Sequence, residues 1–83
     1  DYFIVTYDGQ GRYVLVERHN ALHDLLSRDK FIWKDFLVIK IEVYNPETNT
    51  LEKYIEYEYD KHGEVIERNH YSPNGNLLRH EIF

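Results

Sequence analysis

Two histidines near the middle of this 83-residue chain have a spacing typical of metal ligands. His19 and His23 lie four residues apart, and on a helix this spacing places two imidazoles on one face. His19, however, precedes Asn20, a good helix N-cap, so it lies before the helix that we expect there. No third ligand is defined nearby. We therefore expect surface histidines and no metal site.

A second group of titratable side chains lies in the C-terminal half and has the residue types of general acids and bases: His62, His70, His80, Glu56, Glu64 and Glu67. They have no nucleophile to activate, because the chain lacks cysteine and its serines, Ser27 and Ser72, fall in a predicted helix and a predicted turn. No glycine opens a helix as a phosphate loop requires. We predict a protein without enzymatic activity, catalytic residues or cofactor.

The elements that position these side chains are marked by a repeated turn. Residues 7–11, 59–63 and 71–75 each read Tyr, a turn-former, two residues and Gly. This spacing is typical of a three-residue hairpin loop, in which a type I turn is followed by glycine in the left-handed conformation. We expect positive φ at Gly63 and Gly75. The last two copies repeat every 12 residues, the spacing of an up-and-down meander.

The segment Tyr57–Val65 (YEYDKHGEV) resembles one unit of the YD repeats of RHS-type shells. The resemblance extends over about residues 57–83, although the next copy has Ser72 in place of the Asp. It implies shared β-hairpin geometry. No function follows from it.

The fold that we predict is α+β and mostly β. A fourth turn, at residues 45–50, separates two alternating runs, and Asn20 followed by Leu22, Leu25 and Leu26 predicts one short helix over about residues 20–28. Together these signals indicate a strongly twisted or half-barrel antiparallel meander in a single domain, residues 1–83. Its six strands are expected at about 2–8, 12–18, 36–45, 51–60, 64–72 and 76–83.

The turn lengths also predict which residues face each other. They favour a charged row across the last four strands, made of Lys40, Glu56, Arg68 and His80. The opposite face, with Ile39, Ile41 and Ile55, is expected to be covered by the helix. In this register a second apolar group lies on the charged side, where either curling of the sheet or a protein partner covers it: Val38, Tyr54, Ile66, Leu78 and Ile82.

Charge and composition narrow the possible partners. The formal net charge of −5 argues against nucleic acid, and the chain has no cysteine for a disulfide framework. No run of apolar residues is long enough for a membrane span, so we expect a cytoplasmic protein. Glu52, Glu56 and Glu58 form an acidic strip beside Tyr54, which suits a basic protein target.

These observations favour a non-enzymatic protein-interaction module that uses a β-sheet face or edge, either with its own copy as a homodimer or with a protein target. A small acidic inhibitor or immunity-type protein, blocking a basic nuclease or toxin surface, is the alternative. A structural piece of a larger β-repeat protein is a third interpretation.

Overall fold

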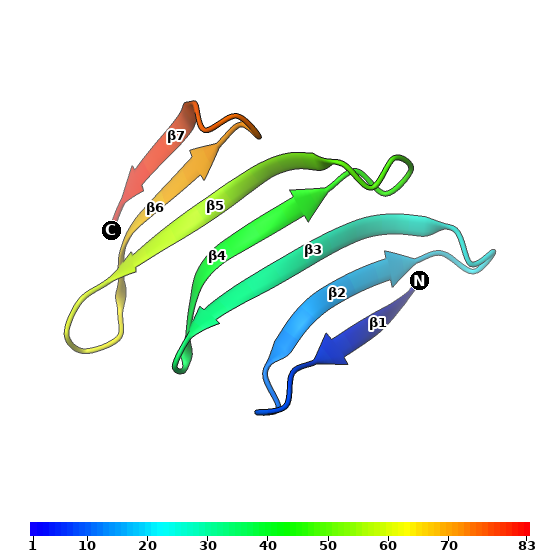
Figure 1. Cartoon of the computed structure of the whole chain (residues 1–83), viewed down its shortest axis with the longest axis horizontal. Helices are drawn as coiled ribbons and strands as arrows, with labels where there is room; N and C mark the ends of the chain where they lie inside the picture. The colour runs from blue at the N-terminus through cyan, green and yellow to red at the C-terminus, as the bar shows by residue number, and fades with distance from the viewer.

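A computed structural model describes all 83 residues as one open antiparallel sheet. The strands lie in the sheet in the order of the chain, each antiparallel to the next, as Figure 1 shows. Their bounds are β1 (Tyr2–Tyr7), β2 (Tyr13–His19), β3 (Leu25–Lys34), β4 (Leu37–Tyr44), β5 (Leu51–Tyr59), β6 (Val65–Tyr71) and β7 (Leu77–Ile82).

Side-chain hydrogen bonds build the predicted turns. Asp60 Oδ1 accepts hydrogen bonds from the backbone N–H groups of His62 at 2.8 Å and Glu64 at 3.0 Å, and Asp8 repeats this pattern in the first hairpin. The φ angles are 80° at Gly63 and 90° at Gly75, so the predicted left-handed glycines are confirmed. The residues of the turns therefore determine these hairpins, as predicted from the sequence.

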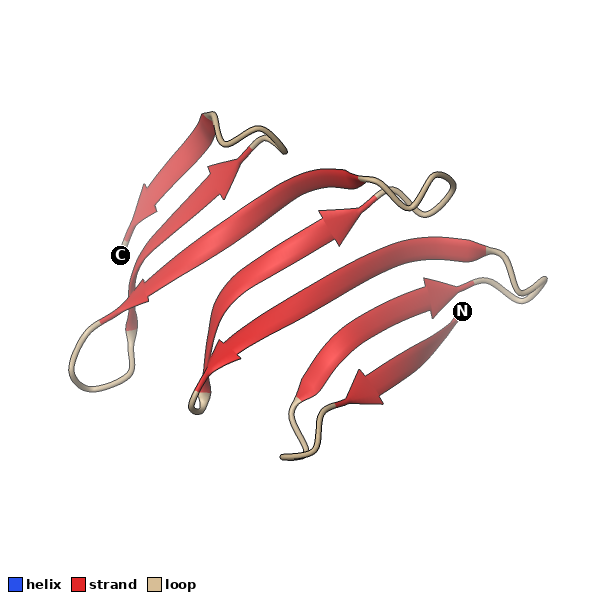
Figure 2. Cartoon of the chain, in the orientation of Figure 1, coloured by secondary structure: helices blue, strands red, loops and turns tan.

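The predicted helix over residues 20–28 is wrong, and with it the α+β class, because the chain is all-β with seven strands (Figure 2). Asn20 does accept hydrogen bonds from the N–H groups of Leu22 at 2.9 Å and Asp24 at 3.1 Å, as a helix cap would. At His23, however, φ is +68°, which turns the chain back on itself. Leu25 then begins a ten-residue strand that continues through the aromatic segment Phe31–Trp33.

Register shifts correct part of the predicted pairing. Lys40 faces Glu56 as expected. Between Glu58 and Tyr59 the β5–β6 ladder shifts by one residue, so Glu56 faces Asn69, and Arg68 faces Tyr57 instead. A one-residue slip turns every later side chain to the other face. The charged row therefore reads Lys40, Glu56, Asn69 and His80.

The sheet is a single layer without a core. None of the 83 residues is buried, and the surface of 5910 Å² exceeds the roughly 5,300 Å² expected of a compact monomer of this mass. The radius of gyration is 14.1 Å, against about 12 Å for a compact chain of this length. The sheet stays open, so the predicted half-barrel is also wrong. Leu22, expected on the apolar stripe of the helix that covers the sheet, is 80 % exposed.

With no helix anywhere in the chain, none is present that is long and apolar enough to cross a membrane.

Candidate functional site

One face of the sheet carries a continuous apolar strip across its central strands. Phe31 on β3, Ile41 on β4 and Ile55 on β5 are direct cross-strand partners and therefore point to the same side. The neighbouring row of cross-strand partners, Val16, Asp29 and Val43, lies on this side as well. We call this side the apolar face. Its defining members are Val5, Val16, Phe31, Ile41, Val43, Ile55 and Tyr57.

An aromatic cluster extends the apolar face toward the β1–β2 turn. The Tyr13 ring meets Phe31 edge-on at 4.9 Å and Trp33 edge-on at 5.1 Å between ring centroids. The Trp33 indole N–H also donates to the Tyr13 carbonyl at 2.7 Å. These contacts fix large apolar surfaces in place without burying them.

Two opposite charges interrupt the apolar face on either side of its central strand. One cross-strand row reads Val16, Asp29, Val43 and Lys53, so Asp29 and Lys53 flank Val43. Desolvation raises the pKa of Asp29, and the positive charge of Lys53 opposes that rise only in part. Neither side chain forms an ion pair within the chain. On its three central strands, β3 to β5, the face therefore presents one unpaired anion and one unpaired cation.

The β6–β7 hairpin ends the apolar face with a polar network centred on Glu81. Arg68 donates two hydrogen bonds to the Glu81 carboxylate, at 2.7 and 3.0 Å. His70 Nε2 lies 2.6 Å from the same carboxylate, and Arg79 lies 3.4 Å away. The Arg68 guanidinium, followed by His70, lowers the pKa of Glu81 to about 2. This network is an ion-pair cluster that orders the hairpin, with no nucleophile beside it.

The other side of the sheet, which we call the charged face, is defined by Lys30, Lys40, Glu42, Tyr54, Glu56, Glu58 and Glu67. Lys40 Nζ lies 4.5 Å from the centroid of the Tyr54 ring and 3.6 Å from a Glu42 carboxylate oxygen. Toward β6 the charges become uniformly acidic, and Glu58 directly faces Glu67. This face is polar on β3 and β4 and acidic on β5 and β6.

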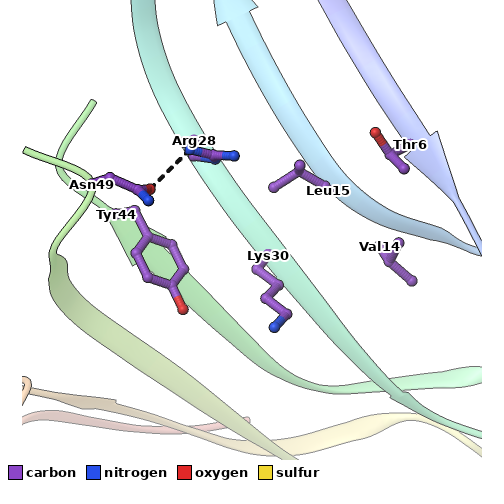
Figure 3. A pocket seen from close by; sticks show the side chains of 7 residues that line it. All are labelled: Thr6, Val14, Leu15, Arg28, Lys30, Tyr44 and Asn49. Carbon is purple, nitrogen blue, oxygen red and sulfur yellow. Dashed lines mark hydrogen bonds between the residues drawn. The ribbon is translucent and has the colours of Figure 1, made fainter. Parts of the chain in front are cut away.

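A shallow hollow of about 420 Å³ lies on the charged face near the β4–β5 turn (Figure 3). Arg28 is held there by Asn49 at 2.9 Å and by Glu17 at 3.4 Å. Lys30 has no ion-pair partner. The lining side chains are those of Thr6, Val14, Leu15, Arg28, Lys30, Tyr44 and Asn49. An open hollow with a single free cation is a weak basis for a small-molecule site.

The interaction residues expected from the sequence do not form one cluster. Tyr54, Glu56 and Glu58 share the charged face, and Glu52 lies on the same strand. Ile82 faces Glu67 on that side and is 80 % exposed. Ile66 is the extra residue of the β6 bulge, lies outside the β5–β6 pairs and is 41 % exposed.

The two remaining candidates also lie apart. Val38 faces Trp33 on β3, and Leu78 lies at the register shift of β7, where it is 62 % exposed. The predicted neighbourhood of Val38, Tyr54, Ile66, Leu78 and Ile82 is therefore wrong, because the register shifts of β6 and β7 separate its members.

The histidines are distributed over the sheet. His19 stacks on the Tyr2 ring at 5.0 Å between centroids, and the Tyr2 hydroxyl lies 2.7 Å from His23 Nδ1, so both rings contact the same tyrosine. His80 pairs with Glu67 at 2.9 Å on the charged face, whereas His70 pairs with Glu81 on the apolar face. No group of three His, Asp or Glu side chains is arranged to hold a metal ion.

Residues 25–34 contribute to the site, although their sequence pattern predicted a helix end and no strand. Asp29, Phe31 and Trp33 alternate along β3 and share the apolar face. The signal was present as the β-forming segment Phe31-Ile32-Trp33, but the leucines before it were assigned to a helix.

No protein-family model, curated protein or solved structure matches the chain.

Proposed function

We propose that this chain is a non-enzymatic protein-interaction module that packs its apolar face against another protein surface. The observation that carries this proposal is the row Phe31, Ile41 and Ile55, which crosses the centre of a sheet that has no second layer and no buried residue. A sheet with one apolar face is stable when that face is covered. In this proposal the partner supplies the second layer that the sheet lacks.

The energetics support a covered face. Burying a side chain of the size of Phe31 or Ile41 contributes roughly 1.5–3 kcal/mol. Ordering each residue of the chain costs about 1–2 kcal/mol of backbone entropy. Phe31, Ile41 and Ile55 are only partly buried in the single-layer sheet, so part of this contribution is missing, and association supplies it. Folding and binding are therefore coupled in this proposal.

The matched substitutions Ile41→Lys and Ile32→Lys test the proposal. Both place the same charge on a central strand, but Ile41 lies on the apolar face and Ile32, the partner of Lys40, lies on the charged face. Sedimentation velocity should show association of the wild type and of Ile32→Lys, and its loss in Ile41→Lys. Equal behaviour of the two variants would mean that the apolar face is not the contact surface.

A basic protein target on the charged face is a second candidate, favoured by one observation. Glu58 directly faces Glu67, and like charges in this arrangement destabilise an isolated sheet. A cationic partner surface would relieve that repulsion, as in an acidic inhibitor. Binding of this kind weakens steeply with added salt, whereas burial of the apolar face does not. Salt dependence therefore separates the two functions.

A further inference from the structure

We propose that the partner covering the apolar face is a second copy of this chain, with the two sheets packed face to face about a two-fold axis that runs along β4. In this arrangement Asp29 of each copy lies over Lys53 of the other. The inference rests on the proposed function, because it names the partner for the same face.

The positions of Asp29 and Lys53 support a two-fold axis along β4. Asp29 and Lys53 lie in one cross-strand row, one strand to either side of Val43, which is about 4.8 Å in each direction. A two-fold rotation about β4 exchanges the positions of β3 and β5. It therefore sets each carboxylate over an ammonium group of the second copy, and both unpaired charges acquire a partner.

Two-fold axes along the neighbouring strands, β3 and β5, do not pair opposite charges. A two-fold axis along β3 would place Asp29 over its own copy, and an axis along β5 would place Lys53 over its own copy. Both arrangements bring like charges together in an apolar layer, and this repulsion disfavours them. Among the three central strands, β4 alone pairs opposite charges.

The apolar side chains fit the same axis. The rotation places Ile41 against Ile41 of the second copy and Phe31 against Ile55 of the second copy, so the apolar row meets itself. Two sheets packed in this way stand about 10 Å apart with strand directions about 30° from each other, so the two-fold axis bisects the angle between the two copies of β4. Near the axis this angle moves side chains by only a few ångströms, and the Asp29–Lys53 contacts remain within reach.

The available area is sufficient for a stable dimer. β4 is the middle strand of seven, so rotation about it overlaps the two sheets along their whole width (Figure 1). The long and intermediate extents of the chain are 43 and 31 Å. A standard interface needs about 800 Å² from each partner, which is less than a face of this size offers.

Even the polar end of the apolar face acquires a partner in this arrangement. The hairpin β6–β7, with Arg68 and Arg79, comes to lie over β1 and β2 of the second copy, where Tyr7 and Tyr13 are direct cross-strand partners. Arg79 contacts Glu81 but is 69 % exposed, so its guanidinium is accessible to an aromatic ring there. The arrangement thus gives an apolar centre and a polar, aromatic rim, as protein interfaces have.

A charge-swap experiment tests the proposal by sedimentation equilibrium. Asp29→Lys and Lys53→Asp, each studied alone, bring like charges together and should weaken association by about tenfold or more. An equal mixture of the two variants restores both opposite-charge contacts and should recover association as a heterodimer. The control pair Lys40→Asp and Glu56→Lys lies on the charged face and should associate as the wild type does.

The outcomes test the two-fold arrangement separately from the proposed use of the apolar face. Recovery in the mixture, with no effect of the control pair, supports the two-fold arrangement. A mixture that stays as weak as its components overturns that arrangement, and if Ile41→Lys still abolishes association, the proposed use of the apolar face stands. A wild type that is a folded monomer at every concentration overturns both.

Discussion

Arg68 on β6 and Glu81 on β7 are direct cross-strand partners, and two hydrogen bonds of 2.7 and 3.0 Å join their side chains. His70 Nε2 reaches the same carboxylate at 2.6 Å. Glu81 thereby joins the last two strands through side chains as well as through the backbone ladder. The same contacts lower its pKa to about 2, from an ordinary 4.5.

This pKa predicts a specific dependence of stability on pH. A carboxyl group whose pKa is lower in the folded state stabilises the fold above its unfolded pKa, and this contribution is lost as pH falls. The stability that Glu81 supplies should therefore be complete above pH 4.5 and disappear as pH falls toward about 2.

Comparison with Glu81→Gln isolates this contribution from that of the other carboxylates. Denaturant unfolding at a series of pH values should show the wild type more stable than the variant near neutral pH, with the difference vanishing in strong acid. A difference that is constant over the whole range would mean that the Arg68–Glu81 pair does not titrate as its geometry requires.

The turn glycines give a second prediction. The φ angles of 80° at Gly63 and 90° at Gly75 are unfavourable for any residue with a Cβ atom. Gly63→Ala or Gly75→Ala should lower the free energy of unfolding by about 1 kcal/mol or more. Gly9 is the control, because its φ is not positive and a Cβ there meets nothing within 4 Å. Equal losses at all three positions would contradict the hairpin geometry.

The turns were predictable because their chemistry is local. Asp60 and Gly63 determine a loop through hydrogen bonds and one backbone angle, and both can be read from neighbouring residues. The pairing of Lys40 with Glu56 was also predictable, because charge and turn length agreed on it.

The register beyond Glu58 was not predictable from the same information. A bulge places Ile66 as an extra residue in β6, and no residue type marks that position in the sequence. One such residue moves Arg68 to the apolar face and Asn69 to the charged face. Ile66, Leu78 and Ile82 are exposed, whereas Val38 and Tyr54 are partly buried, so the five residues do not share the neighbourhood that the predicted register gave them.

The helix prediction was wrong because the hydrogen bonds that Asn20 accepts are the same in a turn and in a helix cap. Asn20→Ala removes the acceptor of the Leu22 and Asp24 N–H groups and should cost about 1 kcal/mol of unfolding free energy. Leu22→Ala should change the stability by less than about 0.5 kcal/mol, because this side chain is 80 % exposed. A large loss in Leu22→Ala would instead indicate a packed helix.

The like-charge pair on the charged face gives a further prediction. Glu58→Gln removes its repulsion with Glu67 and should raise the free energy of unfolding by about 0.2–1 kcal/mol, less at high salt. Glu47→Gln, in the exposed β4–β5 turn, is the control and should have no effect. A loss of stability in Glu58→Gln would show that Glu58 makes a favourable contact in the folded protein.

The thermal unfolding transition, followed by far-UV circular dichroism over a wide range of protein concentrations, tests the need for a covered apolar face most directly. We predict a cooperative transition only where the chain is associated, with a midpoint that rises with concentration. The dilute monomer should unfold without cooperativity. A sharp, concentration-independent transition of a monomer would contradict the account, because the single-layer sheet would then be stable with Phe31, Ile41 and Ile55 in water.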